Sequence, residues 1–275
     1  MKAPIGIPPE FSDLKYLVDW SKKIGLKLIQ LLPLNDTTAT HSWLDSYPYA
    51  AISAFALHPM YLRLQEVIKK DQTNLIAPFQ NQMEQLNALP EIDYDGVMQL
   101  KWKLLKIIYT ENGKKDLATA GFKKFFKQNE HWLVSYSAFS YLRDLHGTVD
   151  FNQWPTHANY NEAAILKLVD LKSKTYQDIA FFYFVQFHLH LQLLEATQYA
   201  HQNGVIVKGD IPIGVYRFGA DAWQNKGLFH MDMQAGAPPD DFAVSGQNWG
   251  FPTYHWGAMA RDGFAWWISR FDQMK

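Results

Sequence analysis

The stretch Lys208-Gly209-Asp210-Ile211-Pro212-Ile213-Gly214-Val215 decides the fold, and it directly follows the apolar residues Val205-Ile206-Val207. This run predicts a buried strand that ends at a carboxylate and passes into a loop shaped by Pro and Gly. In barrel proteins, functional groups stand where parallel strands end. We therefore expect Asp210 at the mouth of a site, although an Asp here can also simply cap the next turn.

A second unit of the same kind lies near the start of the chain. Residues Ser12–Ile24 predict a helix with Ser12 as its cap and an apolar stripe, and Gly25 fits the position just past its end. The nearly continuous apolar run Leu26–Leu34 then predicts a parallel strand covered on both faces. Helix, strand, insertion, helix and strand follow in order, which indicates an α/β fold, part of a (β/α)8 barrel. A closed barrel needs eight strands, and two are visible.

The middle of the chain has a different character. From residue 61 to 172, charged and apolar residues alternate at helical spacing without a buried strand, which predicts a helical insertion. We divide the chain into 1–60 (helix, strand and first loop of the barrel), 61–172 (insertion) and 173–275 (barrel continuation). In this last part we expect a long buried helix over Tyr176–Asn203 and another helix over Trp256–Met274. His188 and His190, two residues apart, should face different sides and pack in the core.

Composition excludes several classes of protein. Among 275 residues, 48% are hydrophobic and 19% charged, the formal net charge is -1 and cysteine is absent. The chain is therefore globular, has no disulfide or thiolate metal site, and offers no electrostatic reason to bind nucleic acid or an anionic membrane. No run approaches the roughly 20 apolar residues of a membrane span, and Met1–Glu10 lacks the features of a signal peptide. We therefore predict a cytoplasmic location.

Aromatic residues are abundant, at 15% with 10 Trp. Exposed Trp and Tyr suit sugar binding because the C–H face of a pyranose stacks on an aromatic ring, although these residues could equally fill a large core. The polar, aromatic loop Asn35–Tyr49, which contains Asp36, is a candidate binding surface or an ordinary connector. Asp221 has the same ambiguity as Asp210. The segment 236–252 projects Asp240, Asp241, Gln247, Asn248 and Trp249 from a path set by Gly and Pro. Glycoside chemistry needs two carboxyl groups, and spacing alone identifies no such pair.

Several ordered motifs resemble one known family. They are Gly209-Asp210-Ile211-Pro212-Ile213-Gly214-Val215, Gly236-Ala237-Pro238-Pro239-Asp240-Asp241-Phe242, Gly246-Gln247-Asn248-Trp249-Gly250-Phe251-Pro252-Thr253-Tyr254, Asp45-Ser46-Tyr47-Pro48-Tyr49 with Ser53-Ala54-Phe55-Ala56-Leu57-His58-Pro59, and Trp266-Trp267 with Arg270. Together they resemble the 4-α-glucanotransferases (amylomaltase or disproportionating enzyme, glycoside hydrolase family 77). The amino-acid sequence around Asp36 and Asp45-Ser46 is most similar to the sequences of the longer plant-cytosolic and Bacteroides-type branch of this family.

The resemblance implies a retaining α-glucanotransferase on a (β/α)8 barrel, acting on maltose, maltooligosaccharides, glycogen or starch. It implies that Asp36, Ser46 and Tyr49 lie at the donor side, with Tyr49 stacking on the sugar. Asp210 and Asp221 would orient the site, and Asp240, Phe242, Gln247 and Trp249 would lie on a lid over the acceptor side. No metal or organic cofactor is implied.

The resemblance also marks what we do not find. The family's nucleophile Asp, in an Arg-Ile-Asp-His stretch, and its acid/base Glu are expected beyond Lys275, and a Ser-Leu-Arg-Ser strand is expected before Gly6. We therefore assign no catalytic residue in this chain and expect a truncated, inactive piece of a parent that could also carry starch-binding modules. Asp272 lies on a predicted helix and is no substitute nucleophile. Two alternatives stay open, an α-glucan hydrolase and a non-catalytic glucan-binding module.

Overall fold

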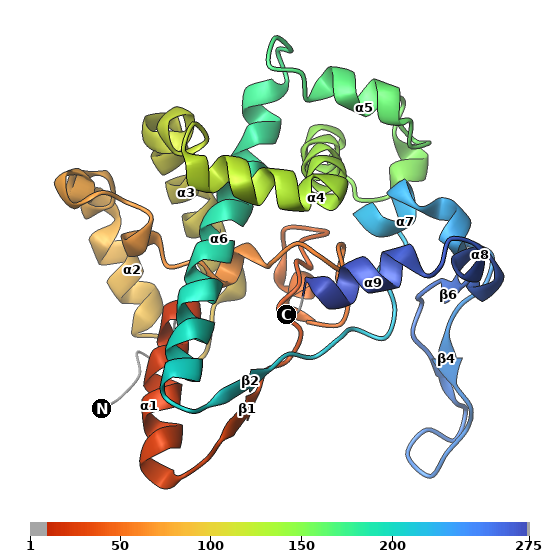
Figure 1. Cartoon of the computed structure of the whole chain (residues 1–275), viewed down its shortest axis with the longest axis horizontal. Coiled ribbons are helices and arrows are strands. Elements are labelled where there is room, and N and C mark those ends of the chain that lie inside the picture. Colours follow the sequence, from red (N-terminus) through yellow and green to blue (C-terminus); the bar gives the residue numbers. More distant parts are fainter. Residues whose placement is uncertain (1–9, 274–275) are drawn as a thin grey trace.

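The computed structural model describes residues 10–273, so the features discussed for residues 1–9, and Met274 at the end of the predicted last helix, lie outside the described residues. The α-helices are α1 (Leu14–Ile24), α2 (Gln80–Asn87), α3 (Tyr94–Asp116), α4 (Ala120–His146), α5 (Glu162–Leu168), α6 (Tyr176–Gln202), α7 (Ala220–Gln224), α8 (Trp256–Arg261) and α9 (Ala265–Asp272). The strands are β1 (Leu28–Gln30), β2 (Ile206–Lys208), β3 (Phe229–His230), β4 (Gly236–Ala237), β5 (Gln247–Asn248) and β6 (Thr253–Tyr254). Figure 1 shows α6 running through the molecule, with α1 beside its C-terminal half.

The first predicted helix is confirmed, but its start differs from the expectation. Gly25 adopts φ +84°, and the backbone hydrogen bonds around it form the Schellman ending that favours glycine. The prediction of Ser12 as the cap was wrong, because Ser12 lies in the 3-10 turn Phe11–Asp13 ahead of α1. Its hydroxyl donates instead to Glu66, at 2.6 Å, and so ties this turn to a distant loop.

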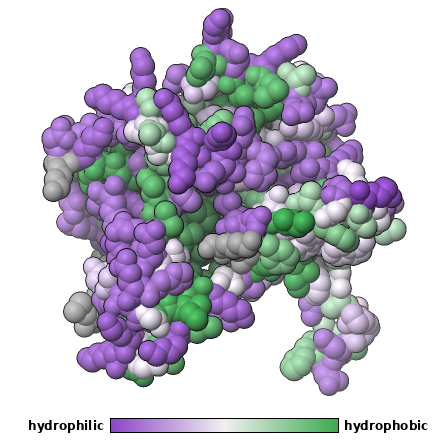
Figure 2. All heavy atoms as spheres, viewed as in Figure 1, coloured by the Kyte–Doolittle hydropathy of each residue, from purple (hydrophilic) through white to green (hydrophobic). Residues whose placement is uncertain are grey.

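The two predicted barrel strands lie side by side. β1 and β2 pair in parallel, with Leu28 opposite Ile206, which is the register expected of two successive α/β units. The expectation that both faces are covered was wrong for the described residues. One face packs Ile29 against α1 and α6, whereas Leu28 is 49% and Ile206 58% exposed. Figure 2 shows apolar surface over this part of the molecule. Two helices cover only one side of a two-stranded sheet.

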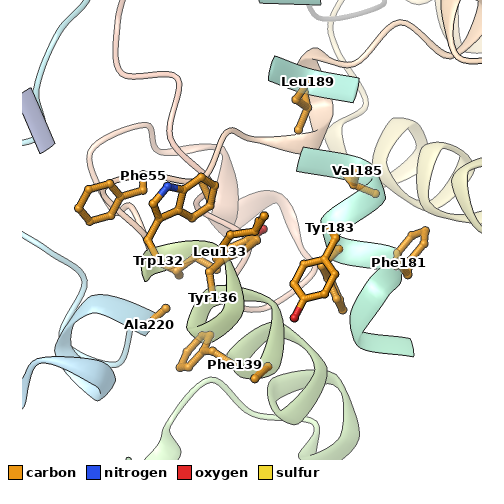
Figure 3. Close-up of a cluster of buried hydrophobic side chains, with 14 of the residues drawn as sticks. Phe55, Trp132, Leu133, Tyr136, Phe139, Phe181, Tyr183, Val185, Leu189 and Ala220 are labelled. Atoms are coloured by element: carbon orange, nitrogen blue, oxygen red, sulfur yellow. The ribbon is translucent and has the colours of Figure 1, made fainter. Parts of the chain in front are cut away.

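The main core lies where α4 crosses α6. Leu133, Tyr136 and Phe139 of α4 face Tyr183 and Val185 of α6 in Figure 3, and all five are buried. The helix over Tyr176–Asn203 was predicted as buried, because a helix without a clear polar face must be covered by other layers, whereas α4 was predicted only as part of the helical insertion. The core therefore assembles around α6, whose C-terminus leads directly into β2.

The two histidines of α6 have the predicted packing role. The His188 ring lies against Phe184, with 4.4 Å between ring centroids, and the His190 ring lies against Phe125 at 5.0 Å. Within residues 10–273 no group of three or more His, Cys, Asp or Glu side chains could hold a metal ion. His188 thus packs within α6, with its Nε2 3.3 Å from Oδ2 of Asp116 in α3, whereas His190 packs α6 against α4.

The insertion is helical, as predicted, and a buried cation fastens it to the start of the chain. Lys101 of α3 is 5% exposed and donates to Glu10, at 2.7 Å, and to the carbonyls of Met60 and Leu62. Burial lowers the Lys101 pKa, which the Glu10 carboxylate partly offsets. A buried charge requires this full set of partners. Residues from all three predicted segments share one hydrophobic core, and the domain division itself stays a prediction.

The prediction of a single helix over the final twenty residues was wrong. α8 ends after Arg261, and Gly263 and Phe264 both take positive φ values, 70° and 59°. The Phe264 N–H bonds to the carbonyl of Met259, which closes α8 with a Schellman motif before α9 begins. A non-glycine residue in the left-handed region is uncommon. The Asp262-Gly263 pair was a sequence signal for this break, of the same kind as Gly25 after α1, and the apolar spacing that continues across it concealed the signal.

Residues 229–254, which we call the arm, form a narrow antiparallel structure. β3 pairs with β6 at its base, and β4 pairs with β5 further out. Figure 1 shows the loop beyond β4 projecting away from the helical body. The arm contains the predicted lid segment 236–252.

Candidate functional site

Two loops that leave the parallel strands meet at Tyr49 and Asp210. The first loop (residues 35–54) follows β1, and the strand-end loop (residues 209–219) follows β2. The Tyr49 hydroxyl donates to Oδ2 of Asp210 at 2.9 Å, and this hydrogen bond raises the pKa of Tyr49. The ring of Tyr47 lies beside that of Tyr49, with 5.7 Å between centroids. Tyr49 and Asp210, both named from the sequence, therefore lie together in the structure, while their contact with a sugar stays a prediction.

Asp210 accepts one local and one distant hydrogen bond. Its Oδ1 accepts the backbone N–H of Ile211 at 2.9 Å, which is a local cap, while Oδ2 accepts from Tyr49. An ionised carboxylate offers about four acceptor sites, so two protein donors leave room for further hydroxyl donors. Asp210 is half-buried and thus within reach of a ligand.

Backbone hydrogen bonds join the first loop to the strand-end region. The Tyr216 N–H donates to the Ala51 carbonyl at 3.0 Å, and the Ala220 N–H donates to the Ile52 carbonyl at 2.7 Å. A Cβ on Gly219 would lie 2.6 Å from the Ile52 oxygen, so the absence of a side chain permits this approach. The two loops therefore form one platform beneath Tyr49 and Asp210.

Asp221 supports this platform from below. Its Oδ2 accepts the Ala54 N–H at 2.6 Å, and the residue is 3% exposed. Burial raises the pKa of Asp221 to about 6, even though the Ala54 N–H and the charge of Arg270 favour the ionised form. Arg270, also buried, donates to the carbonyl of Pro212 at 2.6 Å. Asp221 is therefore not placed to contact a substrate directly, because its buried side chain joins the start of α7 to the first loop.

Asp36 is similarly enclosed. Its Oδ2 accepts the Tyr136 hydroxyl at 2.6 Å, its Oδ1 accepts the N–H and hydroxyl of Thr38, and only 1% of the residue is exposed. Burial, together with Asp36, raises the pKa of Tyr136 well above its usual value. The structure therefore gives Asp36 a supporting place inside the first loop, where it is bonded to α4. Ser46, by contrast, is exposed at the end of the 3-10 turn Trp43–Ser46.

The arm carries the other four predicted residues. Oδ1 of Asp240 accepts the N–H groups of Phe242 and Ala243, at 2.9 and 2.6 Å, and so shapes the tip. The side chain of Phe242 is 97% exposed there. Closer to the body, Nε1 of Trp249 donates to Oε1 of Gln247 at 2.9 Å, with Trp249 37% exposed. Gln247 and Trp249 thus form an amide and aromatic pair open to solvent.

The base of the arm rests on the strand-end loop. A Cβ on Gly214 would lie 2.6 Å from the ring of Phe251, and the Tyr254 hydroxyl donates to the Ile213 carbonyl at 2.9 Å. Arg217 also donates to backbone carbonyls of the arm. Sequence reasoning missed Arg217 and Tyr136. The available signal for Arg217 was that it is the single charged residue in the otherwise neutral stretch 211–219.

A pocket of about 420 Å³ lies on the other side of the first loop. Thr38, His41, Trp102 and Arg143 are among its lining residues, and neither Tyr49 nor Asp210 belongs to them. The Tyr49–Asp210 pair is therefore separate from this enclosed space. Among the helices of residues 10–273, none combines the length and apolar character needed to cross a membrane.

Comparisons with known proteins agree on one group. A family model described as 4-alpha-glucanotransferase, glycoside hydrolase family 77, matches residues 3–275. The chain is 42% identical to the rice protein "4-alpha-glucanotransferase DPE2", covering 96% of this chain and 28% of that protein. It is 34% identical to a 4-alpha-glucanotransferase of Chlamydia pneumoniae, covering 95% and 48%. The chain therefore spans less than half the length of these two curated relatives.

Solved structures give the same result. An amylomaltase from Streptococcus agalactiae in complex with acarbose superposes with a TM-score of 0.79 at 27% identity, covering 98% of this chain and 54% of that one. An amylomaltase from Corynebacterium glutamicum gives a TM-score of 0.76 at 20% identity, covering 96% and 36%. These likenesses confirm the predicted fold class, part of a (β/α)8 barrel with a large helical insertion.

Proposed function

Since this chain belongs to the 4-alpha-glucanotransferase family, glycoside hydrolase family 77, we propose that it supplies a glucan-binding part of an enzyme that transfers glucosyl units between α-1,4-glucans. The observation that carries the proposal is the contact between Tyr49 and Asp210 at the ends of two parallel strands. Tyr49 offers a ring for stacking and Asp210 offers free acceptor sites for hydroxyl groups.

The arm supports transfer rather than hydrolysis. Gln247 and Trp249 lie together on it, and its base contacts the same loop that carries Asp210. An amide beside an indole can bind a second sugar through hydrogen bonds and stacking, and a sugar bound on this solvent-open pair would itself cover the site and exclude water. In our proposal the arm therefore holds the acceptor glucan and keeps water from competing with it.

In the full-length protein, the proposed reaction is a double displacement. One carboxylate attacks the anomeric carbon while a carboxylic acid gives its proton to the departing glycosidic oxygen, which leaves a covalent glucosyl-enzyme. A hydroxyl of the acceptor glucan then attacks the same carbon and gives its proton to the second carboxylate, while the bond between that carbon and the first carboxylate breaks and the free carboxylate is regenerated. We assign neither carboxylate within this chain, because Asp36 and Asp221 are buried under the loops.

The competing proposal for this chain alone is glucan binding without turnover, which the enclosure of those two acids favours. Incubation with maltotriose separates the possibilities. The full-length parent is expected to form longer maltooligosaccharides plus glucose, whereas this chain should bind maltoheptaose in calorimetry without changing it. Formation of shorter sugars alone by the parent would mean hydrolysis and would defeat the transfer proposal.

Trp249→Ala in the full-length parent tests the acceptor side. Stacking of a ring is worth about 1–3 kcal/mol, which corresponds to a loss of about one order of magnitude or more in transfer rate. Trp20→Ala is a matched control, because Trp20 is 53% exposed on α1, away from the arm. Unchanged transfer in the Trp249 variant would remove this residue from the acceptor site.

A further inference from the structure

Arg217 joins both legs of the arm to the strand-end loop. Its Nε donates to the carbonyl of Gly250, at 3.2 Å, on the returning leg. Its two terminal nitrogens donate to the carbonyls of Met231 and Met233 on the outgoing leg. A single planar guanidinium thus satisfies three backbone acceptors that are separated by up to nineteen residues in sequence.

The loop that carries Arg217 is firmly held on its other side. The neighbouring Tyr216 N–H bonds to Ala51 of the first loop, and Gly219 packs against Ile52. The charge of Arg217 therefore projects from a fixed platform, and the carbonyls it binds belong to the segment that projects from the body (Figure 1). Arg217 stands at the joint between the two.

Further out, the arm has little else to set its direction. For described residues 238–248, the hydrogen bonds that the structure gives connect one part of the arm to another, as those of Asp240 and Asn248 do. At the base, Phe251 against Gly214 and the Tyr254–Ile213 hydrogen bond also contact the platform. Of these contacts, only that of Arg217 binds both legs at once.

The shape of the guanidinium group, the hydrogen-bond donor, explains why position 217 is an arginine. The guanidinium presents five N–H groups in a rigid plane, so it can bind acceptors on two sides while keeping one orientation. A lysine ammonium has three donors on a flexible stem and acts as a point charge. Arg217→Lys therefore keeps the charge but loses the simultaneous hold on Met231, Met233 and Gly250.

We propose that Arg217 is a positioning residue that sets the angle between the arm and the strand-end loop, and with it the spacing between the Gln247–Trp249 pair and the Tyr49–Asp210 pair. The inference rests on the proposed function only in taking α-glucan as the ligand. Arg217 then determines how an acceptor glucan on the arm is aligned with a donor at Asp210, without touching either sugar.

Hydrogen exchange and glucan binding test this inference together. In Arg217→Lys, the amides of Ala235 and Trp249, which hydrogen-bond across the arm, are expected to exchange about tenfold faster, the effect of losing about one hydrogen bond. Maltoheptaose should bind at least about tenfold more weakly in calorimetry. The thermal midpoint and the exchange of amides in α4 should not change. Arg261→Lys, an exposed arginine of α8 near the arm base, is the control.

Each outcome decides the inference. Faster arm exchange with weaker maltoheptaose binding supports it, whereas unchanged arm exchange in the lysine variant overturns it. Faster exchange with unchanged binding also overturns it, because the arm angle would then not matter to the ligand. Arg217→Met should enlarge both effects, and if that variant unfolds, the lysine variant alone decides. If the unmodified chain does not bind maltoheptaose, the proposed function fails for this chain. The hydrogen exchange of the arm amides alone then supports or overturns the inference that Arg217 holds the arm at the strand-end loop.

Discussion

Replacing Asp221 with Asn should change how the stability of this protein depends on pH. Asp221 is 3% exposed, and burial raises its pKa from 3.8 to about 6. In the unfolded chain the carboxyl ionises near its ordinary value. Between these two values the folded protein therefore holds a proton that the unfolded chain has lost. The free energy of unfolding must then decrease as the pH rises through this window.

The size of the effect follows from the pKa difference. A shift of about two pKa units corresponds to about 3 kcal/mol, because each unit is worth about 1.4 kcal/mol at 25 °C. This contribution of Asp221 is fully present below pH 3.8 and is lost as the pH rises through about 6. Asn carries no charge at any pH, and its oxygen can still accept the Ala54 N–H that Asp221 accepts at 2.6 Å. Asp221→Asn should therefore gain stability relative to the unmodified protein on going from pH 4 to pH 7.

Urea unfolding at four pH values from 4 to 7 measures this difference. The unfolding free energy of Asp221→Asn minus that of the unmodified protein should rise by about 2.5 kcal/mol across the series, because a small part of the total is already lost at pH 4, and other titrating groups cancel in the subtraction. Asp241→Asn is the control, because Asp241 is exposed on the arm and its difference should stay flat. A flat difference for Asp221→Asn as well would refute the reasoning, since it would mean that the buried carboxyl is ionised in both states over the whole range.

Two further predictions concern the close backbone contact at Gly219 and the exposed apolar residues of β1 and β2. Gly219→Ala should lower the unfolding free energy by about 1–3 kcal/mol, because its methyl group would stand 2.6 Å from the Ile52 oxygen. Gly227→Ala meets nothing within 4 Å, so equal denaturation midpoints for the two variants would contradict this. The exposed apolar pair Leu28 and Ile206, on the uncovered face of the β1–β2 pair, predicts self-association of the chain. Light scattering should show species larger than a monomer and a decrease in Ile206→Lys, whereas a cooperative monomer would oppose the prediction.

The existence of β1 and β2 was predictable because their signals are local, although β1 spans only Leu28–Gln30 of the apolar run Leu26–Leu34 that was predicted as a strand. An apolar run of a few residues followed by Gly and Asp predicts a strand and a loop whatever the rest of the chain does. Gly25 predicted the end of α1 in the same way, and its φ of +84° confirms the reason. The exposure of Leu28 could not be predicted in this way, since it depends on how many neighbouring elements cover the sheet.

The roles of the acids depend on residues far away in sequence. Asp36 is enclosed by Tyr136, one hundred residues further on, and Asp221 is bonded to Ala54, 167 residues earlier. In sequence, both acids resembled Asp210, which stays accessible beside Tyr49. The packing of the insertion and the first loop is what buries Asp36 and Asp221 and leaves Asp210 accessible, and no short motif encodes this difference in burial. The acids named from sequence therefore lie at different depths, and their contact with a substrate stays a prediction.

The strand-end loop connects the Tyr49–Asp210 pair with the arm that carries the Gln247–Trp249 pair, so a change at one pair can reach the other through this loop. It bonds to the first loop through the backbone of Tyr216 and to the arm through Arg217 and Ile213. Backbone hydrogen bonds in a closely packed region resist displacement more than the contacts of a projecting segment, because breaking them leaves buried polar groups unpaired. When a bound glucan pulls on this assembly, the arm should therefore move while the Tyr49–Asp210 pair keeps its place.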